Sequence, residues 1–329
     1  MSKVTYCSIL KNEICSFIKL RESQGFIDKH RRVLSVLDKY LMLIKSESKE
    51  LSPQIVDDWL SKNYNEVTVN TLKNYIMYYN AFAKYLNSLG ISAFIAETPT
   101  RVKSYVPYVF SKEEIEKIFQ IADNKKGKLG NLTCVQFPMF LRILYGCGLR
   151  LNEALLLKLS DVDFENGILH IGKSKNKERL VPMDETLTNI LKTYCSVILA
   201  GKNSNSYLFE SDYNYGSKNC IGQPRAINWA SKNFKHILKE AGIEFTRRVV
   251  HERGICMHCL RHTFTVNSFR NQDIAGVDNY RNTPSLSIYV GHKNLLYTQE
   301  YLHTTAENSE DIIAKTEKYS KGMFPEVPV

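Results

Sequence analysis

The segment His258-Cys259-Leu260-Arg261-His262 opens the stretch of residues 256–302, around which the rest of the chain is organised. In the same stretch, Gly291-His292 is followed nine positions after the histidine by Tyr301. His258 and Arg261 are three residues apart, so on a helix they share one face. An arginine held in this way presents a planar fork of N–H donors that fits two oxygens of a phosphate. The pattern therefore predicts a site for a phosphate-like anion.

A second arginine, Arg150, follows a Gly-x-Gly break and stands at the start of an apolar segment. Two arginines that converge on one anion suit phosphoryl transfer, in which negative charge spreads over the non-bridging oxygens. A tyrosine can attack such a phosphate when a neighbour takes its proton. Position singles out Tyr301 as the nucleophile, whereas Tyr297 is expected to pack. His262 is expected only to hold the helix in place.

A lysine-rich turn, residues 172–179, lies between two short runs that have the composition of β-strands. If the electrophile is a DNA phosphodiester, the leaving deoxyribose 5′ oxygen needs a proton, and Lys173 on this turn is the candidate general acid. A covalent phosphotyrosine keeps the energy of the broken bond, so the same site can rejoin the strand without ATP. Because no carboxylate cluster has the spacing of metal ligands, we expect neither a metal nor another cofactor.

Composition places the chain among proteins with an acidic partner. Its 329 residues favour two domains, and its formal net charge is +10. Nucleic acid is the commonest partner of such a chain, because basic groups displace counterions from phosphates. We expect no membrane span and no signal peptide, and hence a cytoplasmic protein with eight reduced cysteines.

Residues 1–100 carry a helical pattern that predicts a small bundle. Apolar residues recur at helical spacing over residues 33–44. Ser52 followed by Pro53 is typical of a helix start, and a third helix is predicted over residues 68–89. Residues 101–107 are expected to link this part to a second domain, residues 108–329.

The second domain is predicted to be mainly helical with one small sheet. Ser111 and Glu114 form a capping-box pattern at its first helix. The apolar pattern predicts further helices over residues 137–145, 152–159, 186–199 and 225–241. Short β-like runs at residues 162–164, 168–171 and 180–182 predict a small antiparallel sheet. A last helix is expected within residues 309–319.

Taken together, these motifs resemble those of the tyrosine recombinase (phage integrase) family. The resemblance covers roughly residues 107–305 and extends more loosely to the N-terminal helices. It rests on four pieces in order: Gly148-Leu149-Arg150 with Glu153, Gly172-Lys173 through Arg179-Leu180-Val181-Pro182, the segment 258–262, and Gly291-His292 with Tyr301. It implies an α+β, mostly α fold, with a helical N-terminal core-binding (SAM-like) domain and a mainly helical catalytic domain with a small antiparallel sheet.

The resemblance also implies roles for individual residues. Tyr301 would form a 3′-phosphotyrosine, Glu153 would steady Arg150, and Lys173 would be the general acid. Lys175 competes with Lys173 because the turn is one residue longer than the shortest family version, but Lys173 follows the expected glycine. The scissile phosphate would be bound by four residues: Arg150, His258, Arg261 and His292.

The partners that the resemblance implies are double-stranded DNA at a specific recombination site and further copies of the same chain. Four recombinases would act on two DNA sites and exchange strands through a Holliday junction. The last helix, Ser309–Tyr319, would pack into a neighbouring subunit. Accessory DNA-bending or directionality proteins would fit the same scheme.

Three alternatives stay open at this point. The first is a DNA-relaxing enzyme that resembles type IB topoisomerases, and the second is a non-catalytic DNA-binding protein. The third is a zinc site formed by Cys256 and Cys259 with nearby histidines. Structural zinc needs four ligands, commonly in two pairs, and the sequence has no second Cys-x-x-Cys. Thiols that flank the helix of residues 258–262 are therefore favoured over zinc.

Overall fold

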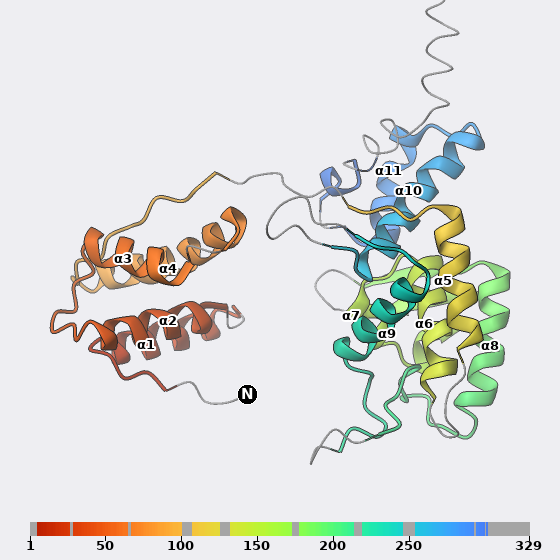
Figure 1. Cartoon of the computed structure of the whole chain (residues 1–329), viewed down its shortest axis with the longest axis horizontal. Helices are drawn as coiled ribbons and strands as arrows, with labels where there is room; N and C mark the ends of the chain where they lie inside the picture. The colour runs from red at the N-terminus through yellow and green to blue at the C-terminus, as the bar shows by residue number, and fades with distance from the viewer. Residues whose placement is uncertain are drawn as a thin grey trace, which may run out of the picture. The chain divides into compact units, whose positions relative to one another are not determined.

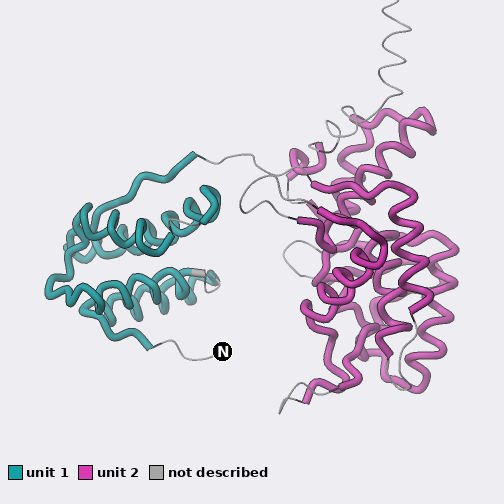
Figure 2. Tube along the Cα trace, in the orientation of Figure 1, with its two compact units in different colours: residues 1–105, 247–252 teal, residues 106–246, 253–329 magenta. Residues whose placement is uncertain are grey.

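The computed structural model describes residues 5–26, 29–64, 67–100, 107–125, 132–172, 178–213, 219–245, 254–292, 294–299 and 301. Contacts within the chain divide it into two compact units, which Figure 2 shows in different colours. Unit 1 comprises residues 1–105 with 247–252, and unit 2 comprises residues 106–246 with 253–329. Lys173, Lys175 and the expected C-terminal helix at residues 309–319 lie outside the described residues.

Unit 1 is a helical bundle, as the periodicity predicted. Its helices are α1 (Lys11–Ser23), α2 (Lys29–Leu43), α3 (Pro53–Tyr64) and α4 (Val69–Ser88) (Figure 1). The side chains of Trp59, Tyr79 and Phe82 are fully buried at its centre. The start of α4 is capped by Thr68, whose hydroxyl accepts a hydrogen bond from the Thr71 N–H. The sequence analysis delimited three of these helices but not α1.

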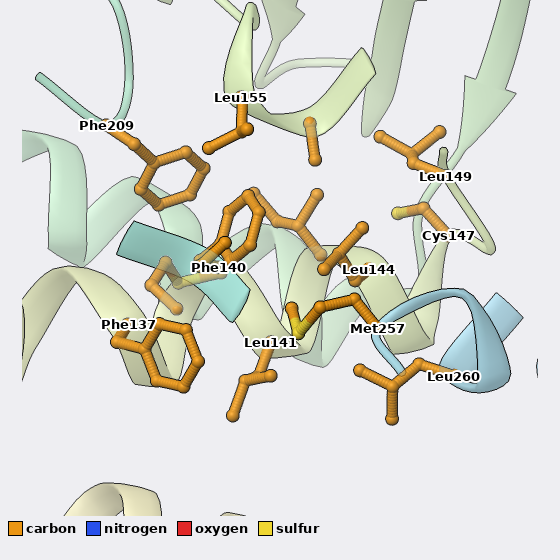
Figure 3. Packing of buried hydrophobic residues seen from close by; sticks show 14 of the residues in the cluster. Phe137, Phe140, Leu141, Leu144, Cys147, Leu149, Leu155, Phe209, Met257 and Leu260 are labelled. Carbon is orange, nitrogen blue, oxygen red and sulfur yellow. The ribbon is translucent and has the colours of Figure 1, made fainter. Parts of the chain in front are cut away.

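Unit 2 is built around helix α6 (Thr133–Gly146), which is buried along most of its length. Figure 3 shows Phe137, Phe140, Leu141 and Leu144 of this helix packed among apolar side chains from other elements. Helix α5 (Lys112–Asn124) packs against α6 and begins with the predicted capping box of Ser111 and Glu114. Helices α8 (Glu185–Ile198) and α9 (Ile227–Glu240) complete this layer of the core.

The small sheet of unit 2 confirms the predicted antiparallel arrangement. Its strands are β1 (Val162–Asp163), β2 (Ile168–Ile171) and β3 (Arg179–Pro182), in the order β1-β2-β3. In the β2–β3 pair, Ile171 lies opposite Arg179 and Leu169 lies opposite Val181. Leu169, Ile171 and Val181 are buried, so the alternation of a strand places Arg179 on the buried face of the sheet.

Three further helices of unit 2 lie close together: the start of α7, the start of α10 and the end of α11 are joined by hydrogen bonds. Helix α7 (Leu151–Leu155) follows α6 closely, and α10 (His258–Ile274) contacts both α6 and α11 (Asn279–Val290). The expected helix over residues 152–159 is wrong in length. After Leu155 the chain leaves the helix, and a short 3₁₀ turn (Leu159–Asp161) leads into β1. Two main-chain hydrogen bonds cause this change, because the Leu208 N–H binds Leu157 O and the Leu159 N–H binds Ser206 O.

Every helix in the described ranges is too short or too polar to cross a lipid bilayer.

Gly148 shows why the turn between α6 and α7 needs a glycine. Its φ of +57° lies in the left-handed region, and a Cβ there would lie 2.4 Å from a ring carbon of Phe264. Gly242, after α9, has a similar φ of +67°, but a Cβ there would meet nothing within 4 Å. A side chain would therefore cause similar backbone strain at either position, but only at position 148 would it also clash with a neighbour.

We predict that Gly148→Ala lowers the free energy of unfolding of unit 2 by roughly 3 kcal/mol, the sum of left-handed strain and overpacking. Gly242→Ala should cost only about 1 kcal/mol, from the strain alone. Urea unfolding of both variants, followed by the fluorescence of Trp229, measures the difference. Equal losses would show that the contact with Phe264 does not constrain this turn.

Candidate active site

Arg150 lies directly before α7, where the turn at Gly148 has brought the chain out of the core. Its guanidinium donates a hydrogen bond of 2.8 Å to Glu153 Oε1, and its main-chain N–H donates one of 2.9 Å to Glu153 Oε2. The guanidinium also donates to the main-chain carbonyl of Gly291. Arg150 is thus held between the start of α7 and the end of α11, with about a quarter of its side chain exposed (24%).

Arg261 lies in the first turn of α10 and is almost completely buried. Its Nη1 donates to Gly148 O at 2.7 Å, and its Nη2 donates to Val290 O at 2.5 Å. Burial, followed by repulsion from Arg150, lowers the pKa of Arg261 to about 9, so the group remains protonated at neutral pH. Because a guanidinium has more N–H groups than these two carbonyls use, donors remain for an anion.

Arg179, at the start of β3, is the third arginine of the cluster. Its Nη1 and Nη2 donate to the two oxygens of Glu153 at 3.1 and 2.8 Å, and its Nε donates to Tyr289 O at 2.8 Å. The Glu153 side chain is almost fully buried. Burial alone would raise the pKa of Glu153, but the hydrogen bonds and charges of Arg179 and Arg150 outweigh it and lower that pKa to about 2.

The C-terminal end of α11 supplies acceptors to all three arginines. Arg179 binds the carbonyl of Tyr289, Arg261 that of Val290, and Arg150 that of Gly291. The last carbonyls of a helix have no partner within the helix and carry partial negative charge. The end of α11 therefore stabilises a cluster of positive charges that would otherwise repel one another.

His292 follows Gly291, which ends α11 in the left-handed conformation with a φ of +70°. The His292 Nδ1 forms a 2.8 Å hydrogen bond with the hydroxyl of Thr298, a fully buried residue. Burial, and then the charges of Arg261 and Arg150, lower the pKa of His292 to about 3. The imidazole is therefore neutral at physiological pH and can both donate and accept a hydrogen bond.

Tyr301 lies within this cluster and belongs to the same chain. Its ring is stacked parallel to His292 with 6.2 Å between the ring centroids, and its hydroxyl is hydrogen-bonded to Nδ1 of His262. The rest of the ring packs in a small apolar cluster with four residues of α10 and α11: Val266, Phe269, Leu286 and Val290. These contacts hold the phenol beside the arginines with its hydroxyl on a histidine.

His258 is the first residue of α10 and lies next to His262. Their rings meet edge to face with 4.6 Å between centroids, because residues four apart share one face of a helix. His258 also lies near enough to His292 to contribute to lowering its pKa. The structure therefore brings together five of the six residues that the sequence analysis selected: Arg150, His258, Arg261, His292 and Tyr301.

Sequence reasoning missed the parts that Arg179, His262 and Thr298 play in this cluster. For Arg179 a signal existed, since strand alternation sets it on the same face as the buried Val181. For His262 the signal was its spacing of four from His258. The expectation that Tyr297 packs in the protein was wrong, because 47% of this residue is exposed.

Cys259 is fully buried in the core of unit 2, and its sulfur accepts a hydrogen bond from the main-chain N–H of Cys256. Among the residues that the structure describes, no three His, Cys, Asp or Glu side chains are grouped so that they could hold a metal ion.

Comparison with known proteins identifies the family to which this chain belongs. Residues 108–308 match the profile of the phage integrase family. A Sinorhizobium fredii protein whose name proposes an integrase or recombinase is 25% identical over 322 residues, which cover 94% of this chain and 98% of that protein. Tyrosine recombinase XerD of Listeria innocua is 30% identical over 217 residues, which cover 66% of this chain and 64% of XerD.

A crystal structure of the XerH site-specific recombinase bound to its difH substrate has a TM-score of 0.62 to this chain at 19% identity. The match covers 82% of this chain and 75% of the XerH chain and shows a shared fold. The comparisons give no support to a type IB topoisomerase or to a non-catalytic DNA-binding protein. Because the family profile spans more than half of the sequence, this chain belongs to the phage integrase family of tyrosine recombinases.

Proposed function

We propose that this protein is a site-specific DNA recombinase that cuts and rejoins DNA through a 3′-phosphotyrosine on Tyr301. The observation that carries the proposal is the position of the Tyr301 hydroxyl, which is hydrogen-bonded to His262 beside Arg261. A phenol next to buried guanidinium groups suits attack on an anion that those groups bind. The nucleophile would act within its own chain, because the same chain supplies the arginines.

The scissile phosphate would be bound by the N–H groups of Arg150 and Arg261 that the protein leaves unused. Both guanidinium groups are held by main-chain carbonyls, so they need not reorganise when the substrate arrives. Their mutual repulsion favours an anion between them, since a phosphate neutralises both charges. His258 and the neutral His292 would add hydrogen bonds to the remaining phosphate oxygens.

The chemical step then exchanges one phosphate ester for another. A bond forms between the Tyr301 hydroxyl oxygen and phosphorus, and the bond from phosphorus to the deoxyribose 5′ oxygen breaks. His262 takes the phenol proton, because its Nδ1 is already hydrogen-bonded to that hydroxyl. Lys173 gives a proton to the leaving 5′ oxygen, with Lys175 as the competing donor. In the reverse direction, a 5′ hydroxyl attacks the phosphotyrosine and the strand is rejoined.

The partners follow from the same chemistry. Double-stranded DNA at a specific site is the proposed substrate, in line with the structural relatives that were solved bound to DNA and with the net charge of +10. Unit 1 would be the core-binding domain, residues 1–100, joined through residues 101–107 to a catalytic domain of residues 108–329. A homotetramer would assemble on two DNA sites in the cytoplasm, with Ser309–Tyr319 of each chain docked on a neighbour and accessory proteins setting direction.

Tyr301→Phe should abolish the covalent adduct between the protein and a nicked target site, because the attacking oxygen is gone. A denaturing gel with labelled DNA separates the adduct from free DNA. Tyr297→Phe is the matched control, since the same atom is removed from an exposed tyrosine four residues away, and it should leave the adduct intact. Adduct formation by the Tyr301→Phe protein would rule out Tyr301 as the nucleophile.

His262→Phe should slow adduct formation by roughly a hundredfold or more, because the phenol loses the group that accepts its proton. Site-specific DNA binding, measured by gel shift, should change little. His262 contacts the Tyr301 hydroxyl and is not one of the groups proposed to bind the phosphate. Single-turnover cleavage of saturating nicked DNA gives the rate. An unchanged rate would assign proton removal to another group.

The affinity for DNA should fall steeply with salt. If about six phosphates are neutralised, the dissociation constant should rise roughly a thousandfold between 50 and 200 mM salt. Fluorescence anisotropy with a labelled duplex at a series of salt concentrations measures the slope. An affinity that stays constant over this range would contradict a mode of binding that depends on backbone phosphates.

A further inference from the structure

Arg179 is a buried arginine at the start of β3 that faces away from solvent and toward the cluster of functional residues. Only 6% of its side chain is exposed, and within the described part of the chain its hydrogen bonds go to Glu153 and to the main chain of Tyr289. It also packs flat against the main chain that precedes His292. A Cβ at Gly291 would lie 3.0 Å from the guanidinium carbon of Arg179, so only glycine allows this approach.

The contacts of Arg179 close a ring of interactions that joins three elements. From β3, its guanidinium reaches both oxygens of Glu153 on α7 and the carbonyl of Tyr289 on α11. Glu153 in turn binds Arg150, whose guanidinium returns to α11 through the Gly291 carbonyl. The ring therefore sets the distance between the start of α7 and the turn at the end of α11.

We infer that Arg179 is a positioning residue for the phosphate-binding site, because it fixes both the carboxylate that holds Arg150 and the main-chain turn that presents His292. This inference rests on the proposed recombinase function. Arg179 itself is turned into the protein and acts through its neighbours.

Charge gives Arg179 a second effect on the site. Glu153 carries one negative charge, and it divides this charge between two guanidinium groups. If Arg150 were its only partner, the pair would be neutral and would attract a phosphate weakly. Because Arg179 shares the carboxylate, the group of three has a net positive charge, and Arg150 keeps its attraction for an anion.

The same contacts predict how the site responds to acid. Three charged groups act on Glu153: Arg150 on the turn before α7, Arg179 on β3 and Arg261 on α10. His292, after α11, and His258, on α10, lie beside those arginines. Arg179 is the largest of the influences that lower the pKa of Glu153. Without it the pKa of Glu153 rises, so the carboxylate is protonated, and releases Arg150, at a higher pH than in the wild type.

The test compares Arg179→Gln and Arg179→Lys in the full-length chain. The rate of adduct formation is measured against the concentration of nicked target DNA from pH 5 to pH 8, which gives a saturating rate and a half-saturating concentration. For Arg179→Gln we expect a saturating rate lower by roughly a hundredfold, as for a misplaced catalytic group, with a smaller change in half-saturation. The acid limb of its rate profile should move to higher pH.

Arg179→Lys separates charge from geometry. A lysine keeps the positive charge beside Glu153, so the acid limb should return toward its wild-type position. It cannot reach both carboxylate oxygens and the Tyr289 carbonyl with the same fork, so the rate should recover only in part. The measured quantity is the shift of the acid limb relative to the wild type, because the other titratable groups of the site are common to all variants.

Arg142→Gln is the matched control. Arg142 also binds both oxygens of a carboxylate, that of Asp123, at 2.8 and 2.7 Å, but outside the ring described above. This variant should keep the wild-type rate and profile. Melting temperatures of all variants, with and without inorganic phosphate, give a readout that does not need catalysis. Phosphate should raise the melting temperature of the wild type and of Arg142→Gln more than that of Arg179→Gln.

Two results would overturn the role of Arg179. One is a wild-type rate and pH profile in Arg179→Gln. The other is an Arg179→Gln protein whose rate, melting temperature and DNA affinity all fall together while the acid limb of the rate profile and the phosphate response stay at their wild-type values. A residue with a purely structural role would give that result. A wild-type protein that forms no adduct would instead refute the proposed recombinase function, and the phosphate response would then decide the role of Arg179 by itself.

Discussion

The guanidinium groups of Arg150, Arg179 and Arg261 lie together in a largely buried site although they carry like charges. The arrangement of the elements around this site depends on the contacts that keep them together. Charges of the same sign repel most strongly where solvent is excluded, and burial adds the cost of lost hydration. One carboxylate, Glu153, offsets part of this cost. The remainder is offset by main-chain carbonyls at the end of α11, which accept hydrogen bonds from Arg150, Arg179 and Arg261. The ionised carboxylate and the helix end together make the cluster stable without neutralising it.

The same arrangement also positions the groups that we propose for the chemical step. Because α11 ends at Gly291 in a left-handed turn, His292 emerges beside the arginines and the chain folds back through Thr298. The apolar side chains of α10 and α11 pack against the ring of Tyr301, and the Tyr301 hydroxyl is hydrogen-bonded to His262. A net positive charge that the protein leaves unbalanced is a binding site for an anion. The anion that we propose for this site is a backbone phosphate of DNA.

The sequence predicted the architecture wherever local rules decide it. The capping box at Ser111 and Glu114, the Ser52-Pro53 helix start and the alternation of residues 168–171 each act over a few residues, and each prediction is confirmed. The helix after Arg150 was predicted too long, because main-chain hydrogen bonds from residues 206 and 208 compete for that segment. Those partners are about fifty positions away, so no local pattern reveals them.

For the site, the sequence by itself determined which residue types are present and in which order: two motif arginines, the histidines and one tyrosine at a set distance from His292. It also determined the charge that makes DNA the natural partner. Only the tertiary structure decided that Arg179 shares Glu153, that His262 holds the Tyr301 hydroxyl and that Tyr297 is exposed. The physical reason is that the decisive acceptors are main-chain carbonyls. Every residue carries one, so no sequence pattern can mark the ones at Gly148, Tyr289, Val290 and Gly291 until the fold brings them to the arginines.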